Sequence, residues 1–508
     1  MLFRSVFADG GFDIVVGNPP YVRQELLGKI NKEFYGKRFS KVGNGTADLY
    51  VYFYELGLSI LKPAGYLSYI TPNKWFKTKY GKELRHFLQP FDIQQIIDFF
   101  ELKIFEDAAT EPQIILIRNQ EKNHDFEYLP VKLTQDFVER KLNPILIHKQ
   151  NLQDSEWVFA DDAVNNLLEK LQKNTISLDE YTKGGIKSGI KTGSNKAFII
   201  SEEIKNQIAK NNPQSNPFIK KYLEGSQIGH YHIKNENEYL LHITWDFEIE
   251  KHPSILKHLE QFKNELGNRP EVISKNYQWF CLSRFASDYW ELFEKDKIVY
   301  IHTAIRHHFY YDKEKHFINN NAYIISNSDL FLSAWLNSKV FDFYKKLIFP
   351  AFGDASTDGR VRLNADKMAN VPIPLLTESQ KAPFIEKAEL MLKLNKELYE
   401  KSQGFLSVVR SELFPATHGM TQSHAMSTNN TMSNWYNLTY EKFVSEIKKQ
   451  KGGFKDLAQQ MEWQGFFKEN QLKAVALKEQ IDATNSEIDE MVFGLYGLSQ
   501  EEIAIVRG

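Results

Sequence analysis

Residues 12–21 read FDIVVGNPPY, and the interpretation of the whole chain starts from this stretch. The apolar run at residues 12–16 is short, which is typical of a buried strand. A glycine and the segment Asn18-Pro19-Pro20-Tyr21 end the run. We therefore predict a strand that stops abruptly at a proline-containing corner.

This corner has unusual chemistry. Pro19 and Pro20 each fix φ and draw the preceding residue toward extended geometry, so the turn is rigid. Their carbonyl oxygens accept hydrogen bonds, and the prolines offer no competing N–H group. Together with the side chain of Asn18, they suit a ligand amino group, and Tyr21 adds a flat face for stacking. A plain strand-ending turn is the structural alternative.

The first 120 residues alternate between strand and helix signals. Short apolar runs predict strands at residues 12–16, 66–71, 93–99 and 113–118, and helical spacing of apolar residues predicts helices at 48–61 and 80–87. This order is typical of a mostly parallel sheet covered by helices. We expect an α/β fold over residues 1–120, with the corner at the carboxyl ends of the strands, where such sheets bind ligands.

The rest of the chain changes in pattern. We expect a connector at 121–175, a mixed α+β domain at 176–376, a helix at 377–413, a flexible polar linker at 414–437 and a helical region at 438–508.

Composition excludes several classes of protein. The 508 residues are 42% apolar and 25% charged, which is typical of a globular chain and not of a disordered or collagen-like one. A single cysteine excludes a disulfide scaffold. No run approaches the roughly 18 apolar residues of a membrane helix, so we expect a soluble cytoplasmic protein. The net charge is −2, so any nucleic-acid surface must be a local basic patch.

Residues 12–21 resemble the catalytic motif of DNA methyltransferases of the N6-adenine type. Three later stretches resemble successive elements of the same catalytic domain: ADLYVYF at 47–53, LKPAGYLSYITP at 61–72 and IFEDAAT at 104–110. Residues 185–198 resemble the opening of a TaqI-like specificity domain, and residues 488–498 resemble the C-terminus of type IIG restriction–modification polypeptides. The resemblance implies a partial Rossmann-like methyltransferase sheet, then a target-recognition domain and a helical end.

The resemblance also implies an activity, which is methyl transfer from S-adenosylmethionine to the exocyclic amino nitrogen of adenine in double-stranded DNA. Asn18 and the Pro19 carbonyl would accept the two amino hydrogens, with Pro20 completing the rigid corner. The adenine would be flipped out of the helix, at a cost of a few kcal/mol. Tyr21 would stack on it and Phe105 would cover another side, although core packing is the alternative for Phe105.

Two other chemistries are not expected. Cytosine-C5 methylation needs a thiolate nucleophile. Cys281 is flanked by apolar residues and is expected to be buried and inert. His307 and His308 have no acidic or cysteine partner at metal-ligand spacing, so we expect no metal site.

In the family that the sequence resembles, the cofactor binds a glycine-rich turn that precedes the catalytic tetrapeptide. Only 17 residues precede Asn18, so we expect neither that turn nor the family's N-terminal nuclease here, and the cofactor-binding residues stay unassigned. The expectation is a site-specific adenine methyltransferase of a restriction–modification system that is incomplete by itself, either completed by a separately encoded N-terminal half or the remnant of a longer gene. The alternatives are a catalytically inactive sequence-specific DNA-binding module and a protein-interaction scaffold.

Basic and aromatic residues interleave between residues 185 and 370, which is the stretch expected to recognise DNA. One group lies in a Gly/Ser/Thr-rich loop, and the others lie in a donor-rich stretch and an extended segment. The candidate DNA-binding residues are Lys187, Lys191, Lys196, Arg306, Arg360 and Arg362. Such cations contact phosphates or guanine edges. For each group an ordinary solvated surface is the alternative.

Overall fold

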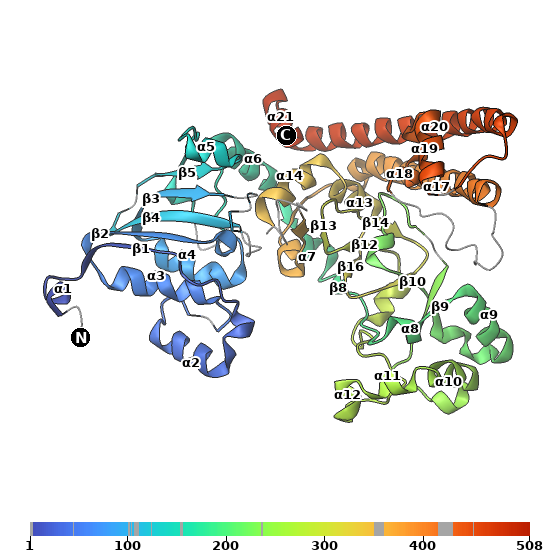
Figure 1. Ribbon diagram of the computed structural model, residues 1–508, viewed down its shortest axis with the longest axis horizontal. Helices are drawn as coiled ribbons and strands as arrows, with labels where there is room; N and C mark the ends of the chain where they lie inside the picture. Colours follow the sequence, from blue (N-terminus) through green and yellow to red (C-terminus); the bar gives the residue numbers. More distant parts are fainter. Residues whose placement is uncertain are drawn as a thin grey trace.

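A computed structural model describes residues 4–43, 45–99, 102, 104–105, 111–122, 124–152, 156–234, 237–349, 360–414, 430–450 and 452–508. Figure 1 shows three parts: an α/β unit (residues 4–152), a central unit of small sheets and helices (residues 156–374), and a helical tail (residues 378–508).

The α/β unit is built on a six-stranded sheet with the order β1-β2-β4-β3-β5-β6. Its strands are β1 (Phe12–Gly17), β2 (Leu61–Pro72), β3 (Phe91–Asp98), β4 (Pro112–Glu121), β5 (Phe126–Pro130) and β6 (Ile145–Ile147). β1 pairs with β2, and β3 with β5, in parallel. β4 runs antiparallel between β2 and β3, and β6 is antiparallel to β5.

This sheet differs from the sequence-based expectation in two respects. Its pairing is mixed rather than mostly parallel, because β4 is antiparallel to both of its neighbours, β2 and β3. The sheet also extends past residue 120, since β5 and β6 lie in the stretch expected to be a connector.

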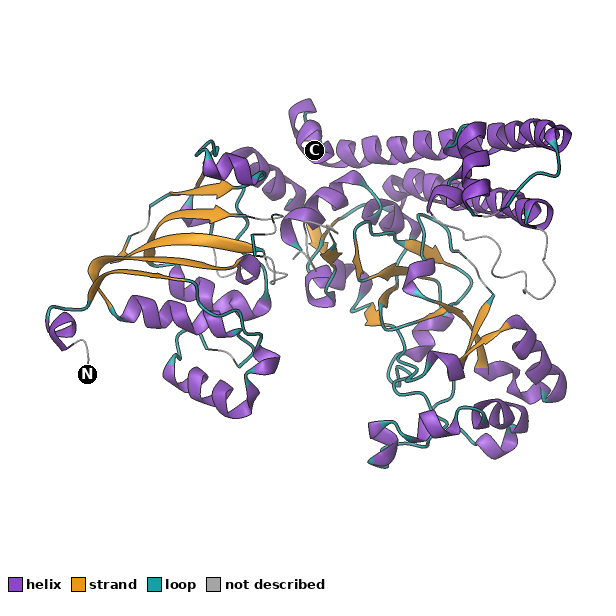
Figure 2. Cartoon of the chain, in the orientation of Figure 1, coloured by secondary structure: helices purple, strands orange, loops and turns teal. Residues whose placement is uncertain are grey.

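Helices α2 (Gly28–Arg38), α3 (Leu49–Ser59) and α4 (Lys82–Leu88) lie on one side of the sheet (Figure 2). The short helices α1 (Arg4–Ala8) and α5 (Thr134–Val138) precede β1 and follow β5. The core between α3 and the sheet contains the buried side chains of Tyr54, Leu67, Trp75 and Ile115. In β2 buried and more exposed side chains alternate, so one face of the sheet carries most of the packing.

β1 is an edge strand. Among the described residues it pairs with β2 alone. Ile14 is 63% exposed and Val16 is 74% exposed. The expectation of a buried strand at residues 12–16 is therefore wrong for this structure, because Ile14 and Val16 point to the same face of the edge strand and no described element buries them there.

The central unit contains two four-stranded sheets and two short ribbons. One sheet is β15 (Phe317–Ile318), β10 (Ile219–Leu223), β11 (Glu238–Leu241) and β9 (Ile199–Ser201). The other is β14 (Tyr310–Asp312), β12 (Lys297–Ile301), β16 (Ala322–Ser326) and β8 (Ile186–Ser188). The ribbons join β13 (Thr303–Ala304) to β17 (Val361–Arg362) and β18 (Pro372–Pro374) to β7 (Thr175–Ser177).

Short helices surround these sheets. They are α6 (Asp162–Gln172), α7 (Leu178–Thr182), α8 (Asn195–Phe198), α9 (Glu202–Asn211), α10 (Pro253–Glu260), α11 (Lys263–Gly267), α12 (Pro270–Ile273), α13 (Leu330–Leu336), α14 (Lys339–Ile348) and α16 (Ala365–Ala369). At the centre, Lys297 Nζ lies 2.6 Å from Asp312 Oδ2, and His316 Nδ1 lies 2.9 Å from Asp312 Oδ1, with all three side chains fully buried.

The helical tail packs on the central unit. It comprises α17 (Glu378–Leu413), α18 (Asn430–Ser433), α19 (Tyr440–Lys449), α20 (Leu457–Tyr496) and α21 (Gln500–Arg507). The long helices α17 and α20 lie side by side (Figure 1). Much of the expected linker at 414–437 falls outside the described residues. At its end, however, Trp435 is buried and stacks on Phe405, with ring centroids 3.7 Å apart. None of the described helices combines the length and apolar content that a membrane crossing requires.

Candidate functional site

The proline-containing corner lies at the carboxyl end of β1, at the surface of the α/β unit. Asn18 and Pro20 are exposed, whereas Pro19 is buried. The chain that leaves the corner is fixed by α3: Leu49 N–H donates to the Val22 carbonyl over 2.9 Å. Asn18 on this rigid turn is therefore accessible to solvent.

Tyr21 and Phe105 lie together beside this corner. Their ring centroids are 6.0 Å apart with the planes at 73°, and Tyr50 contacts Tyr21 at 6.5 Å in a similar edge-to-face arrangement. Tyr21 Oη donates to the Ile70 carbonyl over 3.2 Å, which ties the ring to β2. Burial raises the pKa of Tyr21 to about 12, so its hydroxyl is neutral at physiological pH.

A buried polar layer supports these aromatic rings, and sequence reasoning gave it no role. Tyr54 Oη and Thr71 Oγ1 lie 2.7 Å apart, and Gln113 Nε2 donates to both, over 3.0 and 2.8 Å. Tyr50 Oη is 2.9 Å from Tyr80 Oη. The layer links α3 to the ends of β2 and β4, which fixes the floor behind the corner. Only Tyr50 and Thr71 of this layer lie in the stretches 47–53 and 61–72 that carry the family resemblance.

Asp48 connects the corner's far side to α3. Its Oδ1 accepts the backbone N–H of Gln24 over 2.9 Å. Burial is the main influence on this carboxyl and raises its pKa above the ordinary value, against the lowering effect of that hydrogen bond. The segment after Tyr21 is therefore held at both of its ends.

The described residues do not form the turn that S-adenosylmethionine needs. In α/β sheets that bind nucleotide cofactors, a glycine-rich turn follows a strand and leads into a helix. Here the glycine that ends β1, Gly17, leads into the proline corner, and no glycine-rich turn follows another strand of the described sheet. No three His, Cys, Asp or Glu side chains in the described part of the chain are placed to hold a metal ion.

Two residues that sequence reasoning set aside are buried in the central unit. Cys281 is fully buried, and burial raises the pKa of its thiol to about 12, so a reactive thiolate does not form at physiological pH. Burial lowers the pKa of His307 to about 3, so this imidazole is neutral.

The predicted cations form two groups on the surface of the central unit. Lys187 is half-buried in β8 with its Nζ 6.0 Å from the Tyr289 ring, and Lys191 and Lys196 are exposed in the segment that follows. Arg306 and Arg362 are exposed on the other side of the turn at residues 319–321. That turn joins the groups, because it borders β8 and its Asn321 carbonyl accepts the backbone N–H of His302.

The ribbon β13–β17 explains the second group. Thr303 pairs with Arg362 and Ala304 with Val361, which brings the donor-rich stretch around Arg306 beside the extended segment around Arg360. Two groups that were separate in the sequence thus become one. Asp358 and Gly359, next to them, lie outside the described residues.

The glycines between residues 185 and 193 have a packing role. A Cβ at Gly189 would overlap the Asn319 carbonyl, and one at Gly193 would overlap Ser283 Oγ. Gly193 also has φ +85°, which side chains disfavour. Gly189 therefore lets the segment lie close against the turn that precedes β16, and Gly193 lets it lie close against Ser283.

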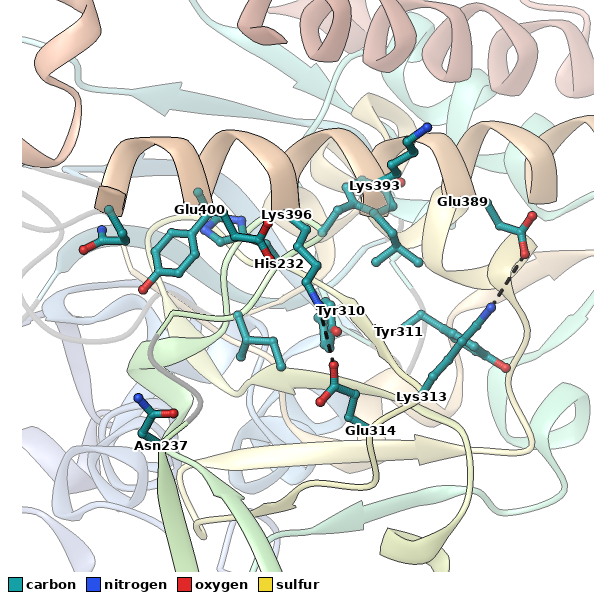
Figure 3. Close-up of a pocket in the computed structure, with 15 residues that line it drawn as sticks. His232, Asn237, Tyr310, Tyr311, Lys313, Glu314, Glu389, Lys393, Lys396 and Glu400 are labelled. Atoms are coloured by element: carbon teal, nitrogen blue, oxygen red, sulfur yellow. Dashed lines mark ion pairs between the residues drawn. The ribbon is translucent and has the colours of Figure 1, made fainter. Parts of the chain in front are cut away.

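A cavity of about 700 Å³ lies between β14 and α17 (Figure 3). Its charged side chains neutralise one another: Lys313 Nζ is 3.6 Å from Glu389, and Lys396 Nζ is 3.9 Å from Glu314. Because these cations already have carboxylate partners, the cavity does not have the electrostatics of a polyanion site.

Comparison with known families supports the sequence-based resemblance. Residues 2–105 match the Eco57I restriction-modification methylase model, and residues 220–373 match the TaqI-like C-terminal specificity domain. Residues 377–492 match a domain of unknown function, DUF8810. The Eco57I match contains the proline corner and Phe105, and the TaqI-like match contains the ribbon β13–β17.

The type II methyltransferase M.BanIII of Aneurinibacillus aneurinilyticus is 26% identical over 71% of this chain and 69% of its own length. The type II restriction enzyme and methyltransferase RM.Eco57I of Escherichia coli is 29% identical over 44% of this chain, but the match covers 22% of its length. The type IIL restriction-modification enzyme MmeI, solved in complex with DNA, shares the fold over 97% of this chain and 56% of its own, with 15% identity and a TM-score of 0.55. The chain thus contains a region similar to the Eco57I restriction-modification methylase family, followed by a region similar to TaqI-like specificity domains.

Proposed function

We propose that this chain is the base-binding and DNA-recognition part of an adenine-N6 DNA methyltransferase of a restriction–modification system. The observation that carries the proposal is the exposed Asn18 on a rigid corner, beside the rings of Tyr21 and Phe105. The match to a restriction-modification methylase and the named methyltransferase relatives support it.

The corner would act on adenine by hydrogen bonding. The lone pair of the exocyclic nitrogen is delocalised into the ring, which makes this nitrogen a weak nucleophile. If Asn18 Oδ1 and the Pro19 carbonyl accept its two hydrogens, the nitrogen moves toward tetrahedral geometry and its lone pair becomes available. Tyr21 and Phe105 meet edge to face, so an adenine stacked on Tyr21 would contact Phe105 along one edge. Stacking contributes about 1–3 kcal/mol per base.

The methyl donor would be supplied beside β1. S-adenosylmethionine is the donor that this chemistry uses, and the described residues do not fit it. Among the described residues no strand pairs with the outer side of β1, and this edge, where Ile14 and Val16 are exposed, suits a further strand that would complete the sheet. We assign that strand to a cofactor-binding half, either on a separate chain or on a longer form of this one.

A test without the cofactor is available. The recognised duplex is first selected from a library with a randomised centre, and each adenine in it is then placed in turn opposite a mismatched base. A mismatch lowers the cost of flipping the base. The chain should therefore bind the duplex with a mismatch at one particular adenine more tightly than the matched duplex.

The chain should bind the mismatched duplex with adenine at that position about tenfold more tightly than the same duplex with purine there, because purine lacks the amino group. Asn18→Ala should abolish this preference and leave binding to the matched duplex nearly unchanged. Asp13→Ala, at an exposed position of the same strand, serves as the control. An equal affinity for adenine and purine in the wild-type chain would refute the assigned role, and binding without any mismatch preference would favour a DNA-binding module that does not flip a base.

A further inference from the structure

A cleft of about 350 Å³ lies beside β8 on the surface of the central unit. One wall comes from the segment that follows β8, including Ser188 and Lys191, and another from the stretch between Arg284 and Tyr289, while Trp245 also lines it. The lining contains two cations and no carboxylate, which distinguishes this cleft from the cavity in Figure 3.

The two cations of the cleft lie directly opposite each other. Lys191 N–H donates to the Arg284 carbonyl over 3.0 Å, and Arg284 N–H donates to the Lys191 carbonyl over 2.9 Å, as in an antiparallel pair. Side chains of such a pair share one face, and like charges placed in this way destabilise it. Both side chains are exposed, and neither forms an ion pair with any carboxylate of the described residues. This arrangement favours an anion held between them.

The third feature of the cleft is an exposed tryptophan in a fixed position. Trp245 is 48% exposed. Its ring stacks on Tyr277 with a centroid distance of 5.6 Å and an interplanar angle of 4°, and Phe285 contacts it edge-on. The indole N–H donates to the Leu282 carbonyl over 2.9 Å. An immobilised aromatic ring is a stacking platform that loses little conformational entropy when it binds.

A buried arginine holds the walls of the cleft together. Arg269 donates to the carbonyls of Thr192, Trp279 and Cys281 over 3.3, 2.6 and 2.9 Å, and its guanidinium lies 5.4 Å from the Tyr277 ring centroid. It therefore connects the segment that carries Lys191 to the residues beneath Trp245. The cations and the ring are positioned before any ligand arrives.

We propose that this cleft is a DNA contact site in which Lys191 and Arg284 hold one backbone phosphate and Trp245 packs against the adjoining nucleoside. Arg284 and Trp245 are new assignments, whereas Lys191 belongs to the cations predicted from the sequence. A guanidinium and an ammonium on one face match a phosphate, because both donate charge-assisted hydrogen bonds to its oxygens. The inference rests on the proposed function, since it requires that the chain binds duplex DNA.

The test uses the full chain and the duplex selected from the randomised library, with affinity measured by fluorescence anisotropy over a range of salt concentrations. Arg284→Ala should weaken binding about tenfold and reduce the slope of log K against log salt by about 0.9, because one phosphate contact is lost. Trp245→Ala should weaken binding about tenfold with the salt slope unchanged, and Trp245→Phe should recover part of the loss.

Lys210→Ala is the matched control, because Lys210 is an exposed cation of the central unit at the end of α9, outside the cleft. It should leave affinity and slope unchanged. Thermal unfolding of each variant identifies loss of folding. If Trp245→Ala lowers the unfolding temperature, the exposed Arg284 decides the question through its own variant.

The outcomes separate the two proposals. If the wild-type chain selects a duplex and Arg284→Ala binds it with wild-type affinity and slope, the cleft is not a DNA contact site, although DNA recognition stands. If the wild-type chain enriches no sequence from the library, the proposed function itself fails.

Discussion

The edge strand β1 of the α/β unit and the inner strand β12 of the central unit differ in how their side chains are partnered. In the α/β unit, the outer side of β1 has no partner among the described residues, and Ile14 and Val16 are exposed. In the central unit, β12 is paired on both sides, and its buried Lys297 is neutralised by Asp312. The inner strand β12 therefore has its backbone paired and its buried charge neutralised within the central unit, whereas β1 presents exposed apolar side chains at an edge suited to another strand.

The largest expected effect tests the buried ion pair of the central unit. Asp312→Asn removes the negative charge between Lys297 and His316, all three fully buried. Removing one partner of a buried ion pair costs about 3–5 kcal/mol, because it leaves an uncompensated charge. Denaturant unfolding should show this loss.

Asp288→Asn, at an exposed position in the same unit, is the control and should change stability by less than about 0.5 kcal/mol. An Asp312→Asn variant as stable as the wild-type chain would mean that the central unit does not depend on its buried charges. The proposed difference between the units would then be lost.

A pH effect tests whether the helical tail packs on the central unit tightly enough to bury a carboxyl group. Asp489 in α20 accepts the backbone N–H of Lys339 at the start of α14 over 2.8 Å. Burial raises the pKa of this carboxyl to about 6, although that hydrogen bond lowers it. The folded state therefore binds the proton more tightly than the unfolded state, and the associated stability is complete below about pH 4 and lost as the pH rises through 6.

Asp489→Asn keeps an accepting oxygen and removes the charge. It should stabilise the chain by about 2 kcal/mol at about pH 8 and have little effect at about pH 4. Urea unfolding at both pH values measures the difference. If the substitution changes the unfolding free energy equally at the two pH values, the carboxyl of Asp489 is solvated. The tail would then not bury it against the central unit.

A smaller effect tests whether the α/β unit is well packed away from the exposed side chains of β1. Tyr54→Phe removes the hydroxyl that contacts Thr71 and Gln113 in the buried layer. The loss of a buried hydrogen-bonding group should cost about 1–2 kcal/mol. Tyr66→Phe is the matched control in β2, because Tyr66 is exposed. Equal stability of the two variants would show that the whole α/β unit is loosely packed. Solvent exposure would then not be confined to β1.

The sequence predicted the local features well and the non-local ones poorly. The strand and corner at residues 12–21 were predictable because proline restricts the chain locally. The resemblance also placed Tyr21 and Phe105 at one site, where the structure brings their rings together. The position of β4 was not predictable, because strand order depends on contacts between distant segments. The pairing of Lys191 with Arg284 is also a distant contact, and neither residue carries a local signal for it.

Periodicity likewise cannot distinguish a buried strand from an apolar edge strand with an exposed face, and the expectation that residues 12–16 are buried was wrong for this reason. The smallest expected change in stability addresses this edge. The double substitution Ile14→Lys and Val16→Lys should change unfolding free energy by less than about 1 kcal/mol, because both side chains already face solvent. Leu67→Ala, on the neighbouring strand β2, should instead cost about 2–5 kcal/mol, because Leu67 is fully buried.

The same double lysine variant should fail to gain methylation when a cofactor-binding half is supplied, because lysines on an edge strand oppose the addition of another strand. Unfolding and methyl transfer thus report on the edge independently. A loss of stability above about 2 kcal/mol in the isolated chain would mean that Ile14 and Val16 are already packed. Undiminished methylation with the double variant would place the docking surface elsewhere, and β1 would be an ordinary edge like the outer strands of the central unit.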